Sequence, residues 1–432
     1  MTSYPQIGFN PYNMYQNWGL GYQYPAFRGV QNQPQPVGVP QPNVNSQTPP
    51  DTVSFKATEH IQTKPKKEGL STGAKWGIGL GLTALAGVGI YLLSRGRANN
   101  LNKLFDEKMV LSNLPENLTY KEAKTIEEGI RYAKEVLKIP TVDDKFTLEA
   151  INFVNKGLVD VSNANKGKLL MPKSLRFANM GEGVHASMNH AIDTNNFAQL
   201  SVNSLFFDDA FLTSTIQRKL KVGKSQIFNL NDKGVLTCHR SLRPTPEFST
   251  LLKKHLSNQP MTLNEKRCLY SSIEEMLSKI HTKGLDNEIV LRVKPPEATI
   301  YHEMGHLQDY LLNLKKLMKD DNAMSKVKKA LFTDENIAID DVNNRFLKKG
   351  DLKTGDLIKY EDNPELLKRD FPLLYEHLYD KQIQAVAGQV SWYSQQGAGE
   401  FVADVYSGLI SGKKFSDEVM ALYKKYGGPS LP

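Results

Sequence analysis

A histidine motif at residues 301–306, Tyr-His-Glu-Met-Gly-His, constrains the fold of this chain more than any other feature. On an α-helix, His302 and His306 lie one turn apart and project from the same face. This spacing allows two imidazole nitrogens to bind one zinc ion, and it places Glu303 beside the water that the ion holds. The motif therefore predicts a metal-binding helix with His302 and His306 as ligands and Glu303 as the general base.

The residues around the motif favour such a helix. Pro295 and Pro296 precede it, and proline is tolerated in the first turn of a helix but not in its interior. Residues 288–293 are largely apolar and β-branched, which is typical of a strand. After the motif, apolar residues recur at helical spacing: Leu307, Leu311, Leu314 and Met318. We expect a strand, a short turn and then the metal-binding helix; the alternative is an ordinary helix whose histidines bind no metal.

A third ligand must come from elsewhere, because catalytic zinc usually has three protein ligands and keeps a fourth position for water. A peptidase class with a third histidine six residues after the second is excluded, since that position is Leu312. The best candidate is Glu400, on a predicted second helix. Asp404 shares its helix face and would accept the free N–H of a ligating histidine. The alternative is a plain helix with two exposed acids. His377 is the only rival for third ligand and ranks below Glu400.

Two stretches resemble the catalytic segments of the anthrax lethal factor family, whose members are gluzincin-type zinc peptidases. Residues 302–309 resemble the family's His-Glu-x-Gly-His-x-x-Asp, and residues 400–404 resemble its Glu-Phe-x-Ala-acid, with Tyr393 seven residues before the glutamate. The resemblance implies a zincin-like metallopeptidase domain and a Zn²⁺ cofactor. The positions that match the family's zinc ligands are His302, His306 and Glu400, and Glu303 matches its base. Tyr393 matches a hydroxyl donor to the reacting carbonyl.

The sequence departs from the family pattern between and within these stretches. The 93 residues of 307–399 are more than we expect for this family, so an insertion is expected there. Gly397 stands where the family tends to have asparagine, and Asp404 stands where it has glutamate. All three matched ligand positions are retained.

An uncharged stretch at residues 76–94 has the length and polarity of a membrane span. As a helix it would extend roughly 28 Å, about one hydrocarbon core. Lys75 precedes it and Arg95 and Arg97 follow it. These features predict a transmembrane helix at residues 75–95 and a single-pass membrane protein. The basic residues on the two sides balance, which leaves the orientation open. The alternative is a glycine-rich buried helix or loop.

The rest of the chain falls into two parts. Residues 1–70 are dominated by proline, glutamine, asparagine and tyrosine, which predicts a disordered tail. Residues 98–432 form the predicted zincin-like metallopeptidase region. Its pattern predicts an α+β fold with a small sheet packed on the active-site helix. Further elements are expected as helices at 121–137 and 371–390 and as strands within 197–207 and 225–238.

Charge and cysteine content limit the function further. Through residue 97 the chain has 8 basic and 3 acidic side chains, against 46 and 43 afterwards, so the predicted folded region is nearly neutral. It has no nucleic-acid-binding motif. Cys238 and Cys268 cannot form a disulfide framework. We expect a membrane-anchored zinc endopeptidase whose peptide or protein substrate adds as a strand to a sheet edge. The alternatives are a membrane-tethered binding or adhesion protein with an inactive zincin-like domain, and a structural zinc site with a fourth protein ligand.

Overall fold

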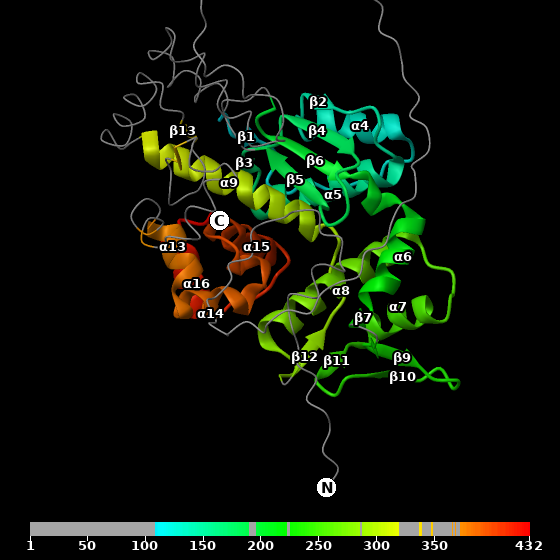
Figure 1. Ribbon diagram of the computed structural model, residues 1–432. Coiled ribbons are helices and arrows are strands. Elements are labelled where there is room, and N and C mark those ends of the chain that lie inside the picture. Colours follow the sequence, from blue (N-terminus) through cyan, green and yellow to red (C-terminus); the bar gives the residue numbers. More distant parts are fainter. Residues whose placement is uncertain are drawn as a thin grey trace, which may run out of the picture. The chain divides into compact units, whose positions relative to one another are not determined.

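The computed structural model (Figure 1) describes residues 109–189, 196–222, 225–285, 287–318, 337–338, 347–348, 365, 368 and 372–432. All of these residues belong to one of the two units into which the chain divides, residues 1–25 with 85–432. The predicted tail at 1–70 and the predicted membrane-spanning helix at 75–95 lie outside the described residues.

The largest described sheet has four strands in the order β2-β4-β6-β5. Strands β2 (Thr141–Val142), β4 (Ser174–Ala178) and β6 (Gln199–Asn203) are parallel. Strand β5 (Ala186–Asn189) is antiparallel to β6 and ends the sheet. The strand expected within 197–207 is β6. Four of its five residues are buried, because the sheet packs against the main hydrophobic core.

Helix α9 (Ala298–Met318) lies between this sheet and the C-terminal helices (Figure 1). It contacts β5 and α5 (Leu148–Ala164) on one side and α15 (Ala398–Ile410) on the other. Its apolar stripe, Ile300, Met304, Leu307 and Leu311, is almost fully buried. The expected order of strand, proline-marked turn and helix is confirmed, because β12 (Ile289–Leu291) precedes α9 and the Pro295 carbonyl accepts the Ala298 N–H.

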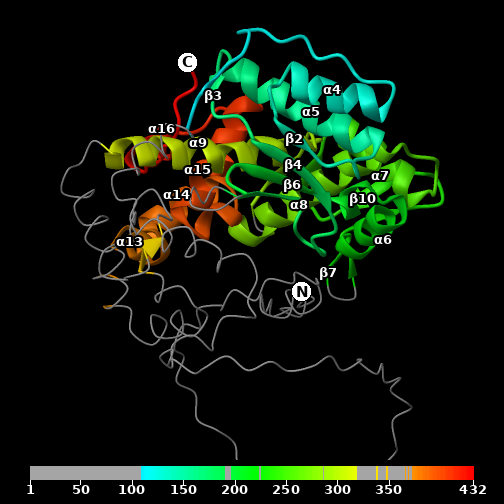
Figure 2. The ribbon, with the colours of Figure 1, turned by 90° about the horizontal axis from the view of Figure 1, so that it is seen from above.

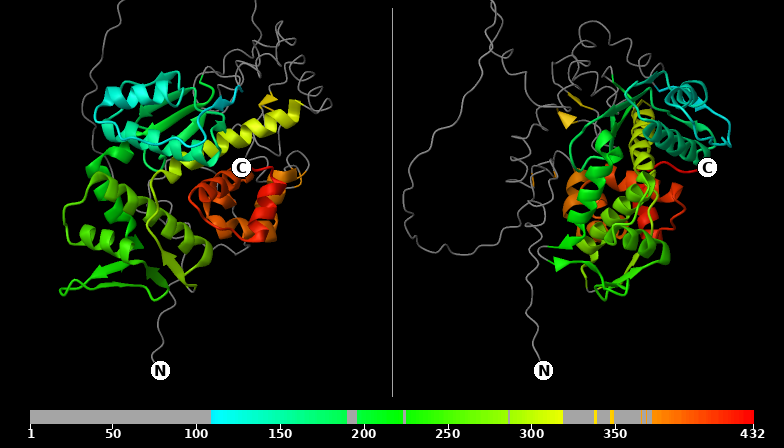
Figure 3. Two further views of the ribbon diagram at one scale, coloured as in Figure 1. Left: turned by 180° about the vertical axis from the view of Figure 1, so that it is seen from behind. Right: turned by 90° about the vertical axis from the view of Figure 1, so that its right-hand side faces the viewer.

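The C-terminal helices pack around a second hydrophobic cluster, which includes Ala387, Phe401, Val405, Tyr423 and Tyr426. Figures 2 and 3 show these orange and red helices gathered beside α9. The helix expected at 371–390 is two helices, since Asp380 begins a new one and its carboxylate accepts the Gln382 and Ile383 N–H groups. The elements are α13 (Pro372–Tyr379), α14 (Lys381–Val390), the 3₁₀ turn η4 (Tyr393–Gln395), α15 and α16 (Asp417–Lys425).

The remaining described elements belong to neither of these two groups. The helices are α4 (Ile126–Glu135), the 3₁₀ turn η3 (Ser204–Phe207), α6 (Asp209–Lys219), α7 (Pro246–Leu256) and α8 (Leu263–Lys283). The short strands pair as β1 (Ser112–Asn113) with β3 (Lys168–Leu169), β7 (Lys221–Val222) with β8 (Ser225–Gln226), β9 (Phe228–Leu230) with β10 (Leu236–Cys238), β11 (Leu242–Pro244) with β12, and β13 (Ile337–Ala338) with β14 (Leu347–Lys348). The fold is therefore α+β with small sheets.

The membrane part of the predicted fold class and the single-pass membrane localisation are corrected. In the part of the chain that the structure describes, no helix has both the length and the apolar composition to cross a membrane. The longest described helices, α8 and α9, have 21 residues each but carry several charged side chains.

Candidate metal centre

The two helices that carry the predicted ligands pack in direct contact. A Cβ atom at Gly305 of α9 would lie 2.9 Å from the Cα of Ala403 in α15 and 3.3 Å from its carbonyl oxygen. Glycine is therefore needed inside the histidine motif, because any side chain would separate the helices. The Ser407 hydroxyl donates to the Ala298 carbonyl at 2.8 Å and ties α15 to the start of α9. This packing brings together ligands that lie 98 positions apart in the sequence.

The three predicted ligand atoms form a nearly equilateral triangle. The Nε2 atoms of His302 and His306 lie 3.1 Å apart. Oε2 of Glu400 lies 3.1 Å from the first and 3.3 Å from the second. Tetrahedral zinc with bonds of about 2.0–2.1 Å separates its ligand atoms by roughly 3.3–3.4 Å. Among the described residues, these three form the only group whose donor atoms are close enough to hold a metal ion.

Hydrogen bonding between neutral side chains does not account for this triangle. Nδ1 of His302 lies 2.8 Å from an oxygen of Asp404 and must donate to it, so Nε2 of the neutral ring is an acceptor. That acceptor faces Oε2 of Glu400, which is also an acceptor. Two acceptors at 3.1 Å repel each other, so this contact needs a proton on Nε2 or a metal ion between the two atoms. The donor set of two imidazoles and one carboxylate is one that zinc binds at catalytic sites.

The local charges favour a cation at this point. Burial lowers the pKa of His302, but hydrogen bonds with Asp404 and Glu400 outweigh burial and hold the pKa well above its ordinary value. Burial likewise opposes the charge on His306, whose pKa is raised by the Glu400 carboxylate. Burial raises the pKa of Glu400, but His306 and His302 hold it well below its usual range. The field that favours a proton here also favours a divalent metal ion.

Asp404 lies behind His302, one of the two histidines that the sequence predicts as ligands. Its Oδ1 atom accepts the Nδ1–H of His302 at 2.8 Å. Its Oδ2 atom accepts hydrogen bonds from the hydroxyls of Ser391 and Ser394, the latter at 2.8 Å. The sequence assigns a role to neither serine, although Ser391 lies in the Val-Ser-Trp-Tyr segment that leads to Tyr393, because hydroxyl side chains near a tyrosine carry no spacing signal. The bond to Asp404 fixes the His302 tautomer and leaves Nε2 free to bind a metal.

Glu303 is 9% exposed and faces β5 rather than solvent. Burial raises the pKa of its carboxyl group, and the neighbouring His302 and His306 counteract part of that rise. Its carboxylate accepts a hydrogen bond from the backbone N–H of Met188 in β5. The predicted base therefore contacts the last strand of the sheet. This contact was not predicted, since nothing in the sequence relates residue 188 to the motif.

Tyr393 lies beside the ligands and is open to solvent. Its ring centroid is 5.8 Å from that of His302, with the two planes inclined by 41°. Its side chain is 46% exposed, whereas Ser394, next in the chain, is fully buried. Tyr393 therefore combines a position beside a predicted ligand with a side chain that is partly open to solvent.

His377, the rival third ligand, belongs to a different network. It is fully buried in the C-terminal cluster. Its Nδ1 lies 2.9 Å from the Tyr426 hydroxyl, and its Nε2 lies 2.9 Å from the Ser394 carbonyl oxygen. Burial lowers the pKa of His377 to about 4. Both ring nitrogens have protein partners, so His377 supports the turn that carries Tyr393 instead of binding a metal.

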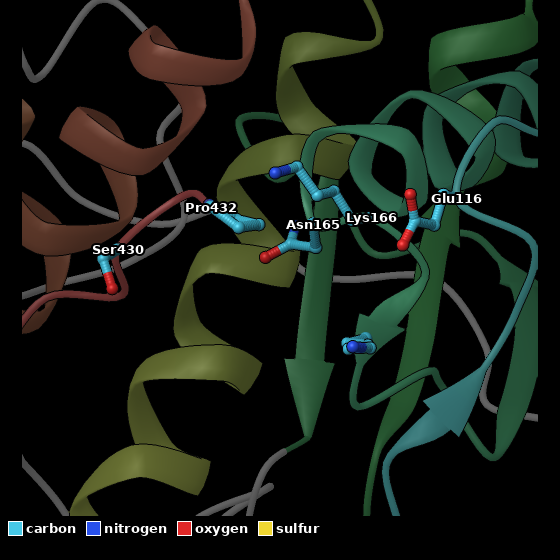
Figure 4. Close-up of a pocket in the computed structure, with 6 residues that line it drawn as sticks. Glu116, Asn165, Lys166, Ser430 and Pro432 are labelled. Carbon is cyan, nitrogen blue, oxygen red and sulfur yellow. The ribbon is translucent and has the colours of Figure 1, made fainter.

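A surface pocket lies apart from the metal centre (Figure 4). It is lined by Glu116, Asn165, Lys166, Lys168, Ser430 and Pro432. Its connection to α15 is the Asn165 side chain, which donates to the Tyr406 hydroxyl at 2.6 Å. The pocket contains none of the residues that the histidine motif predicts.

Comparisons of this chain with protein-family models, with curated proteins and with solved structures find no match. The functional argument therefore depends on the geometry described above.

Proposed function

We propose that this protein is a zinc-dependent endopeptidase in which Glu303 is the general base. The observation that carries the proposal is the triangle of His302, His306 and Glu400 donor atoms, with sides of 3.1–3.3 Å. Glu303 follows a ligand directly in the same helix and is buried beside it. The membrane anchor is not part of this proposal.

Zinc bound to these three residues would polarise the scissile carbonyl and lower the pKa of a water molecule to about 7. Glu303 takes the proton of the attacking water and passes it to the leaving amine. Burial raises its pKa above the ordinary value of a carboxyl group, which favours proton uptake by a group that must both accept and donate a proton. Tyr393 donates a hydrogen bond to the oxyanion, an interaction that contributes roughly 3 kcal/mol in comparable sites.

An extended peptide fits the outer side of β5. The Asn203 N–H donates to the His185 carbonyl at 2.9 Å, so His185 and Ser187 direct their backbone groups towards β6. Hydrogen-bonded and non-hydrogen-bonded residue pairs alternate along antiparallel strands. The backbone N–H and C=O groups of Ala186 and Met188 therefore point away from β6. The Met188 N–H reaches Glu303. A peptide that adds to this edge therefore has its backbone beside the base, which makes an extended segment of peptide the expected substrate class.

The test is proteolysis of an unbiased peptide library by the full chain loaded with zinc. We expect the wild type to cleave, and Glu303→Gln to lose at least about 1000-fold in rate while it still binds zinc. Glu297→Gln is the matched control, because Glu297 precedes the same helix but lies outside the cluster. Equal rates for Glu303→Gln and the wild type would overturn the proposal. Zinc binding with no cleavage by the wild type would instead favour a binding protein.

A further inference from the structure

The turn that carries Tyr393 is attached to four helices. The Trp392 N–H donates to the Ser278 hydroxyl of α8 at 2.8 Å. The Ser394 carbonyl lies 2.9 Å from His377 of α13. Gln384 of α14 exchanges two hydrogen bonds with Gln395, at 2.9 and 3.0 Å. The fourth attachment is to Asp404 of α15. Three attachments therefore hold the turn without any contact to the metal centre.

The fourth attachment differs from the others, because the Asp404 carboxylate that accepts it also accepts a hydrogen bond from His302 of the candidate metal centre. Ser391 and Ser394 donate to Oδ2 of Asp404, and Oδ1 accepts from His302. The Ser391 hydroxyl also accepts the Ser394 N–H at 2.9 Å, which closes the turn around the two hydroxyls. Both oxygens of Asp404 thus have fixed partners, and the carboxylate cannot rotate without breaking one set.

We infer that Ser391 and Ser394 are positioning residues for the metal centre, acting on His302 through Asp404. Their hydroxyls hold the Asp404 carboxylate in the orientation that directs the Nε2 atom of His302 towards the metal. The same bonds set the position of Tyr393 relative to that metal. The claim about Tyr393 rests on the proposed function, whereas the claim about His302 rests only on metal binding.

Removal of the Ser391 and Ser394 hydroxyls should weaken zinc binding. Without them, Oδ2 of the partly buried Asp404 carboxylate loses both hydroxyl donors, which is unfavourable. The carboxylate is then free to turn, and its bond to His302 weakens. Partners of ligating histidines typically account for 10–100-fold in metal affinity. We expect Ser391→Ala/Ser394→Ala to bind zinc about tenfold more weakly than the wild type, and Asp404→Ala to show a loss at least as large.

The experiment measures zinc affinity of the full chain by competition with a chromophoric chelator, with folding checked by circular dichroism. Ser391→Ala alone is included in case the double variant does not fold. Ser391→Thr keeps a hydroxyl at a half-buried site and should restore wild-type affinity. Ser278→Ala removes another attachment of the same turn and should leave zinc affinity unchanged, because Ser278 does not contact Asp404.

The deciding comparison repeats the serine substitutions in the Asp404→Ala background. If the hydroxyls act through Asp404, they cause no further loss there. Zinc affinity within twofold of the wild type for the serine variants overturns the inference, and so does an equal loss with and without Asp404. None of these readouts needs turnover. A failed library proteolysis with the expected zinc affinities would therefore reject the proposed peptidase function and leave this inference intact.

Discussion

The protein buries histidines in two contrasting settings. At the contact of α9 and α15, His302 and His306 face the carboxylates of Glu400 and Asp404. In the C-terminal cluster, His377 faces a tyrosine hydroxyl and a backbone carbonyl. Burial disfavours the charged ring in both settings. Yet the pKa of His302 is held far above its ordinary value, while the pKa of His377 falls to about 4.

The difference teaches that partners, rather than burial, decide what a buried imidazole does. Carboxylates create a site that attracts positive charge, which is the requirement for a metal ligand. Neutral donors and acceptors create a site for a neutral ring with a fixed tautomer, which is suited to holding helices together. Four experiments, three with substitutions and one with a change of pH, test this difference between the two settings.

The largest expected effect is the loss of zinc binding in His302→Ala. Removal of one of three ligands should weaken zinc binding by about 1000-fold or more, because two ligands rarely hold zinc at a catalytic site. His377→Gln should bind zinc within a few-fold of the wild type. Chelator competition on both variants measures the contrast. A similar loss of affinity in both would show that the two settings are not distinct.

The second effect isolates the charge of the third ligand. Glu400→Gln keeps the size of the side chain but removes its charge, and we expect zinc affinity to fall by about 100-fold. Glu376→Gln is the control, since Glu376 is a carboxylate of the C-terminal helices that pairs with Lys425. Isothermal titration with zinc checks both variants. Full affinity in Glu400→Gln would mean that Glu400 is not a ligand.

The third effect is the pH dependence of stability from His377. Its pKa is lower in the folded state, about 4, than in the unfolded chain, about 6.5, so the unfolded chain binds more protons between these values. Stability from this group is therefore present above pH 6.5 and is lost as the pH falls. We expect about 2 kcal/mol less free energy of unfolding at pH 5 than at pH 7. Urea unfolding of the wild type and His377→Gln isolates the contribution, since the variant should show a shallower dependence; an identical dependence would refute it.

The smallest effect concerns the helix contact that assembles the metal centre. Gly305→Ala places a Cβ 2.9 Å from the Ala403 Cα and should lower the free energy of unfolding by about 1–3 kcal/mol. It should also weaken zinc binding, because the helices must separate. Gly397→Ala is the matched control: its added Cβ meets nothing within 4 Å. Thermal unfolding and zinc titration are measured for both variants. Equal stability and equal zinc affinity in Gly305→Ala and Gly397→Ala would contradict the close contact between the helices.

The sequence predicts the α9 part of the site well, because His302, Glu303 and His306 owe their common position to one helical turn. Glu400 and Asp404 were found by asking which residue could complete a zinc ligand set, since no periodicity joins residues 98 positions apart. The contacts of Ser391 and Ser394 with Asp404 could not be predicted from the sequence, because they depend on a turn whose shape is set by four separate helices. None of the described helices could cross a membrane, and the residues of the predicted anchor lie outside the described part of the chain.

The contact between α9 and α15 has a consequence for the stability of the chain. Cys238 and Cys268 are both free in the described part of the protein, so these two cysteines supply no covalent cross-link. A metal ion shared by His306 and Glu400 would close a loop of about the length for which a disulfide contributes roughly 4–5 kcal/mol by restricting the unfolded chain. The ion would then act as a reversible cross-link between distant segments. Its removal would lower the melting temperature, as reduction of the disulfide does in a disulfide-bonded protein.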